Sequence, residues 1–405
     1  MKFVNFAAGV CAVLLTTGAF GQDDRPIQVP AGTPLHELYM SSGPNHNSVL
    51  PPTLTNSNIP TWSYSVVSPV DGKTYKGTIM GVNPATKPGK VTVIPTVVVP
   101  IRLVFKYNAT TSYIFDPTVA DPGCLGTGNS AYKLTQNSPL FGDFAYKFGS
   151  TTVGTTQYID AFQRANFWKD VAASGGANYH TLLGFTPEPV QTVTVTSSKT
   201  GSPDGSVYQF SGLCGSSTTN VNIPGGLGVM SFGFWDTTAQ SLITKLGITP
   251  NSFVFFLFYN TVMSSGTPVN LNTCCILGYH DIVGGQTYGN GEFEGRDSTL
   301  FTGTADASAL SHEFAEWIND PNTANPTPSW GHIGQVSGCQ GNYEVGDPLS
   351  GTLMPPIKMP NGFTYHMQEM AFFDWFYRVD PSIGVNGWYS NNGTFTSDAG
   401  AVCTN

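Results

Sequence analysis

The stretch Ser252-Phe-Val-Phe-Phe-Leu-Phe-Tyr259 is apolar at every position between its two ends. A strand that is apolar on both faces is typical of the centre of a sheet that is covered on both sides. The preceding residues 236–246 predict a helix, because Thr237 and Gln240 form a candidate capping box and Gly247 follows as a stop signal. We therefore expect a helix followed directly by a buried central strand.

Downstream of this strand, residues 275–283 predict a shorter strand that carries His280, and residues 306–319 predict a helix that ends before Pro321. Upstream, residues 158–171 predict another helix. Residues 90–105 are dense in β-branched side chains and predict a strand, which the prolines at positions 95 and 100 should break or restrict to a sheet edge. Together these elements predict an α+β protein with a β-rich N-terminal half.

The composition supports a folded core and argues against nucleic-acid binding. The chain has 405 residues, of which 40% are hydrophobic and 11% charged, and its net charge is −9. It has no run of Lys or Arg, whereas a nucleic-acid binder normally presents a basic patch. The length exceeds one ordinary domain of ~100–200 residues, although a single large β-rich unit also fits it.

The N-terminal residues predict an export signal. Lys2 precedes a mostly apolar run to Phe20, and small residues at Ala19 and Gly21 suit cleavage before Gln22. The run is short for a membrane span, so we expect a secreted, extracellular or periplasmic protein with a signal peptide at 1–21 and no membrane span. We then expect an extended arm at 22–65, a β-rich region at 66–235 and an α+β region at 236–405, the last two either separate or one continuous domain.

Six cysteines remain once Cys11 of the signal peptide is set aside. An even number in an exported chain favours three disulfides, and six cysteines allow 15 pairings. Cys274 and Cys275 are adjacent, so we expect them to bond to different partners.

The segment Ser311-His-Glu-Phe-Ala-Glu-Trp-Ile-Asn-Asp-Pro321 carries the strongest chemical signal. On a helix, His312 and Glu316 lie one turn apart on one side, where both can bind one metal ion. Glu313 flanks that side and is placed to accept a proton from a water molecule. The spacing matches the zinc-peptidase pattern His-Glu-x-x-His, with Glu316 in place of the second histidine. The alternative is an ordinary solvated polar face opposite an apolar stripe.

A third ligand is expected from Asn342-Tyr-Glu-Val-Gly-Asp-Pro348. Glu344 is the first candidate, because some zinc peptidases take a carboxylate ligand from a segment downstream of the helix. Asp347 is its competitor, or a residue that orients a ligand. His280 is a candidate for orienting or polarising a substrate carbonyl, or for binding the ion itself.

These segments resemble a family of exported, largely uncharacterised bacterial proteins that have a Ser-His-Glu-x-x-Glu-x-x-x-Asp-Pro helix and a later Glu-Ile/Val-Gly-Asp segment. Leu277-Gly-Tyr-His280, residues 157–168 and residues 365–376 are similar to further blocks of that family. The resemblance runs patchily from about residue 90 to residue 403. It implies a zincin-like mixed sheet with an active-site helix in the C-terminal half, and a metallopeptidase-like activity.

The first hypothesis is therefore a secreted metal-dependent hydrolase that acts on peptides or proteins, with Glu313 as general base. Zinc is the favoured ion, and manganese or calcium also suits a donor set rich in carboxylates. The second hypothesis is a non-enzymatic exported binding or cell-wall-associated protein with a structural cation. A third is a glycosidase that uses a pair of carboxylates such as Glu313 and Glu344.

Overall fold

The computed structural model describes residues 25–30, 33, 35, 58–173, 175, 178–200, 202–210, 225–295, 301, 303–331 and 339–399. The expected signal peptide at 1–21 lies outside these residues, as do Cys214 and Cys403. Much of the expected arm at 22–65 also lies outside them. The described parts of that arm contain β1 (Ile27–Val29) and the first residues of β2 (Thr61–Val67), so both take part in sheets.

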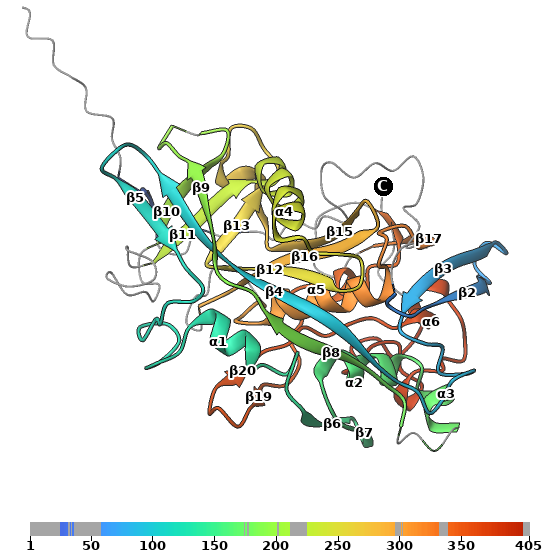
Figure 1. The fold of residues 1–405 in the computed structure, drawn as a ribbon. Coiled ribbons are helices and arrows are strands. Elements are labelled where there is room, and N and C mark those ends of the chain that lie inside the picture. The colour runs from blue at the N-terminus through green and yellow to red at the C-terminus, as the bar shows by residue number, and fades with distance from the viewer. Residues whose placement is uncertain are drawn as a thin grey trace, which may run out of the picture.

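Helices and strands are both well represented, and the chain is an α+β protein whose N-terminal half is rich in strands (Figure 1). The remaining strands are β3 (Thr74–Met80), β4 (Val91–Lys106), β5 (Ser112–Phe115), β6 (Phe144–Phe148), β7 (Thr151–Thr156), β8 (His180–Pro187), β9 (Gln191–Thr196), β10 (Gly205–Phe210), β11 (Gly226–Ser231), β12 (Phe253–Tyr259), β13 (Thr261–Ser264), β14 (Cys274–Ile276), β15 (Gly278–Val283), β16 (Gln286–Phe293), β17 (Pro326–Trp330), β18 (Gln340–Asn342), β19 (Ile357–Lys358) and β20 (Thr364–Tyr365). The helices are α1 (Ala131–Gln136), α2 (Tyr158–Asn166), α3 (Trp168–Ala173), α4 (Phe232–Leu246), α5 (Ser308–Asn319) and α6 (Phe373–Tyr377), with 3₁₀ turns η1 (Leu271–Thr273), η2 (Asp347–Leu349) and η3 (Val385–Gly387).

The main sheet has seven strands in the order β15-β16-β12-β4-β5, and β8 and β9 also pair with β4. β12 runs parallel to both β4 and β16, whereas β15 runs antiparallel to β16 at the end of the sheet. A second sheet has the order β1-β10-β11-β13-β14. Because β4 and β12 come from the regions 66–235 and 236–405, one sheet joins the two regions that the composition suggested.

The expected buried central strand is confirmed as β12, in which every residue is buried. Successive side chains of a strand point to opposite faces of the sheet. Accordingly, Phe255 stacks on Phe314 of α5 with ring centroids 4.5 Å apart, while Phe256 packs on Trp235 of α4 at 5.4 Å. The helices α4 and α5 therefore cover opposite faces of the sheet, as Figure 1 shows. This packing orients α5 and with it the candidate site.

The two prolines of β4 neither break the strand nor restrict it to an edge, so that prediction was wrong. β4 is continuous from Val91 to Lys106 and has neighbours on both sides. Pro95 lies one residue before the pairing with β12 begins at Thr96. Pro100 lies between the end of the pairing with β8 and the start of the pairing with β9. The missing N–H groups thus fall where the strand changes neighbours.

Two helix predictions need corrected boundaries. α4 starts at Phe232 rather than Asp236, because the Ser231 hydroxyl accepts a hydrogen bond from the N–H of Phe234 and serves as the N-cap. Its predicted end is confirmed, since Gly247 adopts the left-handed conformation with φ of 64°. The expected helix at 158–171 consists of α2 and α3, which are separated at Phe167.

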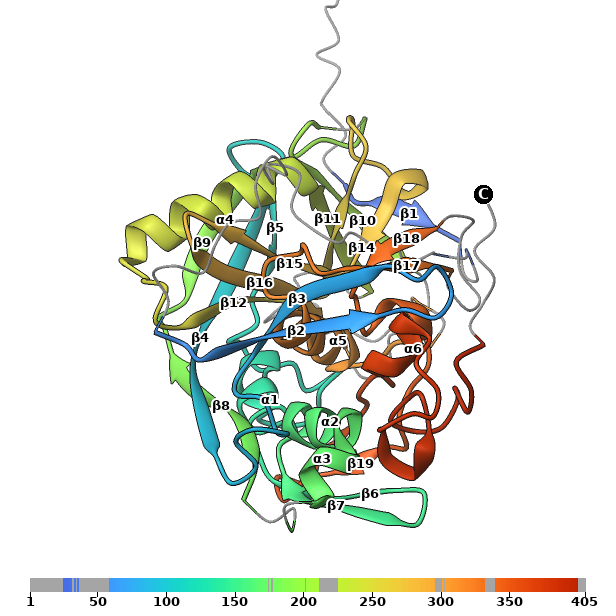
Figure 2. The ribbon, with the colours of Figure 1, turned by 90° about the vertical axis from the view of Figure 1, so that its right-hand side faces the viewer.

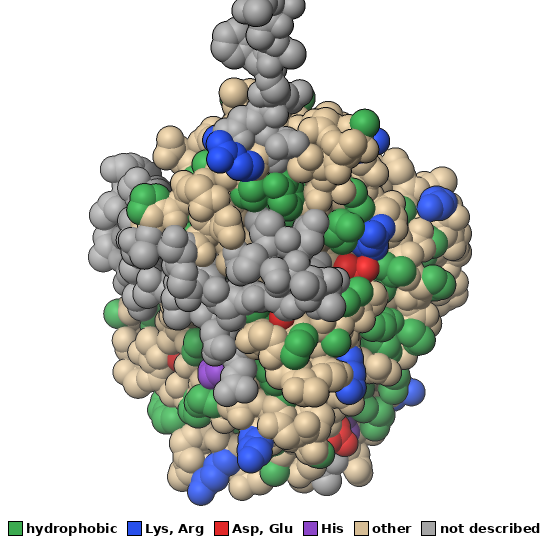
Figure 3. All heavy atoms as spheres, turned by 90° about the vertical axis from the view of Figure 1, so that its left-hand side faces the viewer, with side chains coloured by type: hydrophobic (Ala, Val, Ile, Leu, Met, Phe, Trp, Pro, Cys, Tyr) green, Lys and Arg blue, Asp and Glu red, His purple; other side chains and the backbone are tan. Residues whose placement is uncertain are grey.

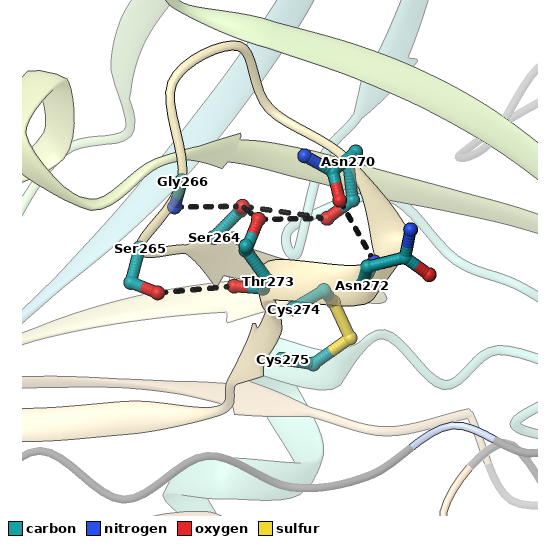
Figure 4. Close-up of a disulfide and its surroundings, with 8 residues drawn as sticks. All are labelled: Ser264, Ser265, Gly266, Asn270, Asn272, Thr273, Cys274 and Cys275. Atoms are coloured by element: carbon teal, nitrogen blue, oxygen red, sulfur yellow. Dashed lines mark hydrogen bonds between the residues drawn. A yellow bond between two sulfur atoms is a disulfide. The ribbon is translucent and has the colours of Figure 1, made fainter.

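The expected strand at 275–283 is two short strands in different sheets, β14 in the five-stranded sheet and β15 in the seven-stranded sheet. At the start of β14 the side chains of Cys274 and Cys275 lie next to each other, and Figure 4 shows a bond between their sulfur atoms, whereas different partners were expected. That expectation rested on the strain that a bond between adjacent cysteines places on the chain.

The surface is poor in charge. On the face in Figure 3, uncharged polar side chains and backbone predominate, and the Lys and Arg side chains drawn in colour are scattered. This agrees with the 11% of charged residues in the chain. Within the described part of the chain, no helix combines the length and hydropathy needed to cross a bilayer.

Candidate metal centre

α5 supplies three of the candidate residues, His312, Glu313 and Glu316. Its apolar side packs on the sheet, because Trp317 stacks on Phe253 with ring centroids 3.7 Å apart. The sequence suggested either a metal-binding side or a solvated polar face opposite this apolar stripe. The opposite side is not solvated, because the residue His312 is only 6% exposed and Glu316 only 3% exposed. α5 also contacts α2, β3, β15 and β16, and Figure 2 shows it deep within the molecule, behind β2 and β3.

A first group of possible ligands consists of His312, Glu316 and Asp347. His312 Nε2 lies 3.0 Å from Glu316 Oε1 and 3.4 Å from Asp347 Oδ1. Zinc bonds of 2.0–2.1 Å at tetrahedral angles place ligand atoms about 3.3–3.4 Å apart. Both distances from His312 Nε2 are close to this spacing, and all three donor atoms lie within 4.8 Å of one another.

The imidazole of His312 is oriented by Gln368. His312 Nδ1 lies 3.1 Å from Gln368 Oε1, and the Gln368 amide nitrogen donates to the carbonyl oxygen of Gly346 at 2.7 Å. Because the side-chain oxygen of Gln368 can only accept, Nδ1 of His312 carries the proton and Nε2 faces the carboxylates. Metal-binding histidines commonly have their second nitrogen oriented in this way.

Gly346 allows the ring of His312 to approach the backbone. A Cβ atom at position 346 would lie 2.6 Å from His312 Nδ1. The backbone φ of Gly346 is −84°, which any residue can adopt, so the glycine is required by the close approach and not by the turn. The N–H groups of Gly346 and Asp347 donate to Glu316 Oε1 at 3.1 and 3.2 Å and orient that carboxylate.

A second group consists of His280, Glu316 and Glu344. His280 is carried by β15 and is fully buried. Its Nδ1 lies 3.9 Å from Glu316 Oε2 and 3.7 Å from Glu313 Oε2, and its Nε2 lies 3.9 Å from Glu344 Oε2. The Nε2 atom is also 2.9 Å from the carbonyl oxygen of Asp320. His280 thus lies among three carboxylates.

Glu344 directs one carboxylate oxygen at this cluster. Its Oε1 accepts a hydrogen bond from Asn342 at 2.8 Å. Its Oε2 is buried, and among the described residues none makes a hydrogen bond to it. A buried charged oxygen without such a partner is costly unless a proton or a cation lies beside it.

Burial and crowding shift the pKa values of the cluster. The pKa of Glu344 lies well above its usual 4.5, because burial and then the nearby carboxylates, Glu316 first, disfavour its charge. Burial likewise raises the pKa of Glu316. Burial alone would lower the pKa of His312, but Glu316 and Asp347 outweigh it and raise the pKa well above 6.5. All three shifts favour the protonated forms in the absence of metal.

We expect the metal-free protein to lose stability as the pH rises. Groups with a raised folded pKa contribute stability that is fully present below their unfolded pKa and is lost as the pH passes through the folded pKa. For Glu344 this loss begins above 4.5, and for His312 above 6.5. Urea unfolding of protein treated with a chelator, at pH 5 and at pH 8, measures the effect. The Glu344→Gln variant should show a weaker pH dependence, and an equal dependence would contradict the assignment.

The expected site residues form two groups in the structure, and these differ from the single group that the sequence predicted. Asp347, the competitor, lies with His312, while Glu344, the first candidate, lies with His280. Asp320 belongs to neither group, because its carboxylate accepts from the N–H groups of Ala324 and Asn325. No sequence pattern predicted a role for Gln368 or Gly346. Gln368 lies in the block 365–376, and Gly346 lies between the two downstream acids, but neither residue type marks a metal site by itself.

Comparison of the chain with family models, with curated proteins and with solved structures gives no match.

Proposed function

We propose that the protein is a metal-dependent hydrolase, and that an ion bound by His312, Glu316 and Asp347 is its first requirement. The observation that carries this proposal is the spacing of 3.0 and 3.4 Å from His312 Nε2 to the two carboxylates. The orientation of the imidazole by Gln368 supports it, because Nδ1 is held by Gln368 and Nε2 is the nitrogen left to bind an ion beside the carboxylates. Zinc fits the spacing, and manganese or calcium fits the carboxylate donors.

Glu313 is the candidate general base. A bound divalent ion would polarise a water molecule and a substrate carbonyl. Glu313 follows the ligand His312 on α5, and its Oε2 lies 3.7 Å from His280 Nδ1, inside the same cluster. In the proposed reaction Glu313 accepts a proton from the attacking water and passes it to the leaving group. We include in this proposal that the substrate is a peptide or protein and that the protein is exported from the cell. Both points rest on the sequence.

Removal of the metal tests the proposal. The full chain is treated with EDTA, dialysed, and incubated with denatured casein and with a mixture of synthetic peptides, whose products are identified by mass spectrometry. We expect hydrolysis by the protein as isolated, its loss after EDTA treatment, and its return when Zn²⁺, Mn²⁺ or Ca²⁺ is added. Hydrolysis that survives complete metal removal would overturn the proposal.

A structural cation is the second candidate function, and burial favours it. His280 and Glu344 are fully buried, and Glu313 is 5% exposed. A substrate must reach the ion in a hydrolase, whereas a structural ion is best kept from solvent. If EDTA lowers the melting temperature and no substrate is cleaved before or after metal is added, the structural role replaces the catalytic one.

A further inference from the structure

The two oxygens of Glu316 face different groups of possible ligands. Oε1 lies 3.0 Å from His312 Nε2, on the side of Asp347. Oε2 lies 3.9 Å from His280 Nδ1, within the group that also contains Glu344. A carboxylate that presents one oxygen to each of two donor groups is placed to bridge two metal ions, which in two-metal sites lie roughly 3.5–4 Å apart.

Both imidazoles present a nitrogen to the carboxylates in the way that metal binding requires. The carbonyl of Asp320 can only accept a hydrogen bond, so the contact of 2.9 Å places the proton of His280 on Nε2. Nδ1 of His280 then faces Glu313 and Glu316 with a lone pair. Nitrogen and carboxylate lone pairs repel one another at this range unless a cation or a further proton lies among them.

Glu344 provides an independent observation at the same place. Its buried Oε2 has no hydrogen-bond partner among the described residues and lies 3.9 Å from the ring of His280. Charge gives the same indication. Five buried carboxylates lie in this region, and cations bound among them would offset their accumulated negative charge: those of Glu313, Glu316, Asp320, Glu344 and Asp347.

We propose a second divalent metal ion on His280, Glu344 and Glu316, so that the centre is dinuclear and Glu316 bridges its ions. This inference rests on the proposed function, since it presumes an ion at His312, Glu316 and Asp347. The donor atoms of the second group lie within 4.8 Å of one another, with His280 Nδ1 3.9 Å from Glu316 Oε2, and are more widely spaced than those around His312 Nε2. That spacing favours an ion with longer bonds than zinc, bound mainly through oxygen, such as Mn²⁺ or Ca²⁺.

Metal stoichiometry with Mn²⁺ as the probe tests the proposal. The full chain is freed of metal, loaded with excess Mn²⁺, desalted, and analysed for manganese per chain and by electron paramagnetic resonance. We expect two ions per chain and a spin-coupled spectrum from the unmodified protein, a readout that requires no variant. Glu344→Gln and Asp347→Asn should each bind one ion and show an uncoupled spectrum. The matched control Glu188→Gln, at a half-buried residue that belongs to neither group, should bind two.

The outcomes separate this inference from the proposed function. One ion per chain, lost in Asp347→Asn and retained in Glu344→Gln, overturns the second ion and leaves the first intact. No bound manganese and no bound Zn²⁺ in any sample overturns both. Two ions with an uncoupled spectrum would overturn the bridge formed by Glu316.

Discussion

Turnover by the Glu313→Gln variant is expected to fall by ~10²–10⁴-fold while its metal content stays at the level of the unmodified protein. Loss of a general base typically costs that factor. Glutamine has the shape of glutamate but cannot accept the proton from water. The glutamine side chain also fits at position 313, because the neighbouring residue Gly278 has no side chain. A Cβ atom at position 278 would lie only 2.7 Å from Oε1 of Glu313.

Two measurements on the same preparation check this result. Initial rates of cleavage of the peptide substrate give the change in turnover, and elemental analysis gives the metal content. Glu188→Gln is the matched control and should retain full activity. An unchanged rate in Glu313→Gln would exclude Glu313 as the base, and a loss of metal together with activity would make it a ligand.

The Glu316→Gln variant is expected to lose both ions and all hydrolysis, with metal affinity reduced at least ~100-fold. Even residues that only orient metal ligands typically cost 10–100-fold in affinity, and Glu316 is a ligand candidate in both groups. The fold should be retained, because the glutamine oxygen can still accept from the N–H groups of Gly346 and Asp347.

Competition with a chromophoric chelator measures the affinity of Glu316→Gln for Zn²⁺ and Mn²⁺, and circular dichroism reports the fold. Asp347→Asn provides the comparison, since it should lose the first ion alone. If Glu316→Gln binds metal as tightly as the unmodified protein, Glu316 is not a ligand, and neither the proposed first ion nor the bridge is correct.

The sequence correctly predicted the helices and strands whose packing follows from a local apolar pattern. It did not predict features that depend on contacts between distant segments. β12 and α5 were predictable, because an apolar run and an apolar stripe reveal which faces pack. Pro95 and Pro100 were misjudged, since the change of neighbour along β4 depends on where β8, β9 and β12 begin and end.

The residue types of the candidate site were predictable, but their grouping was not. The spacing of His312 and Glu316 on a helix placed them together. The choice between Glu344 and Asp347 depends on how η2 and the segment before it pass α5, which no local pattern encodes. The role of Gln368 depends equally on packing, because this residue reaches His312 from a segment 56 residues away.

The glycine at position 346 gives a criterion for comparing other sequences with this one. A methyl group there would lie 2.6 Å from the ring of His312, so any larger residue must displace the imidazole. A chain that shares the helix motif but carries a bulkier residue at the equivalent of Gly346 would need another arrangement of its first ligand. Conservation of this glycine, in addition to that of the acids, would therefore distinguish chains with the same centre from those that share only the motif.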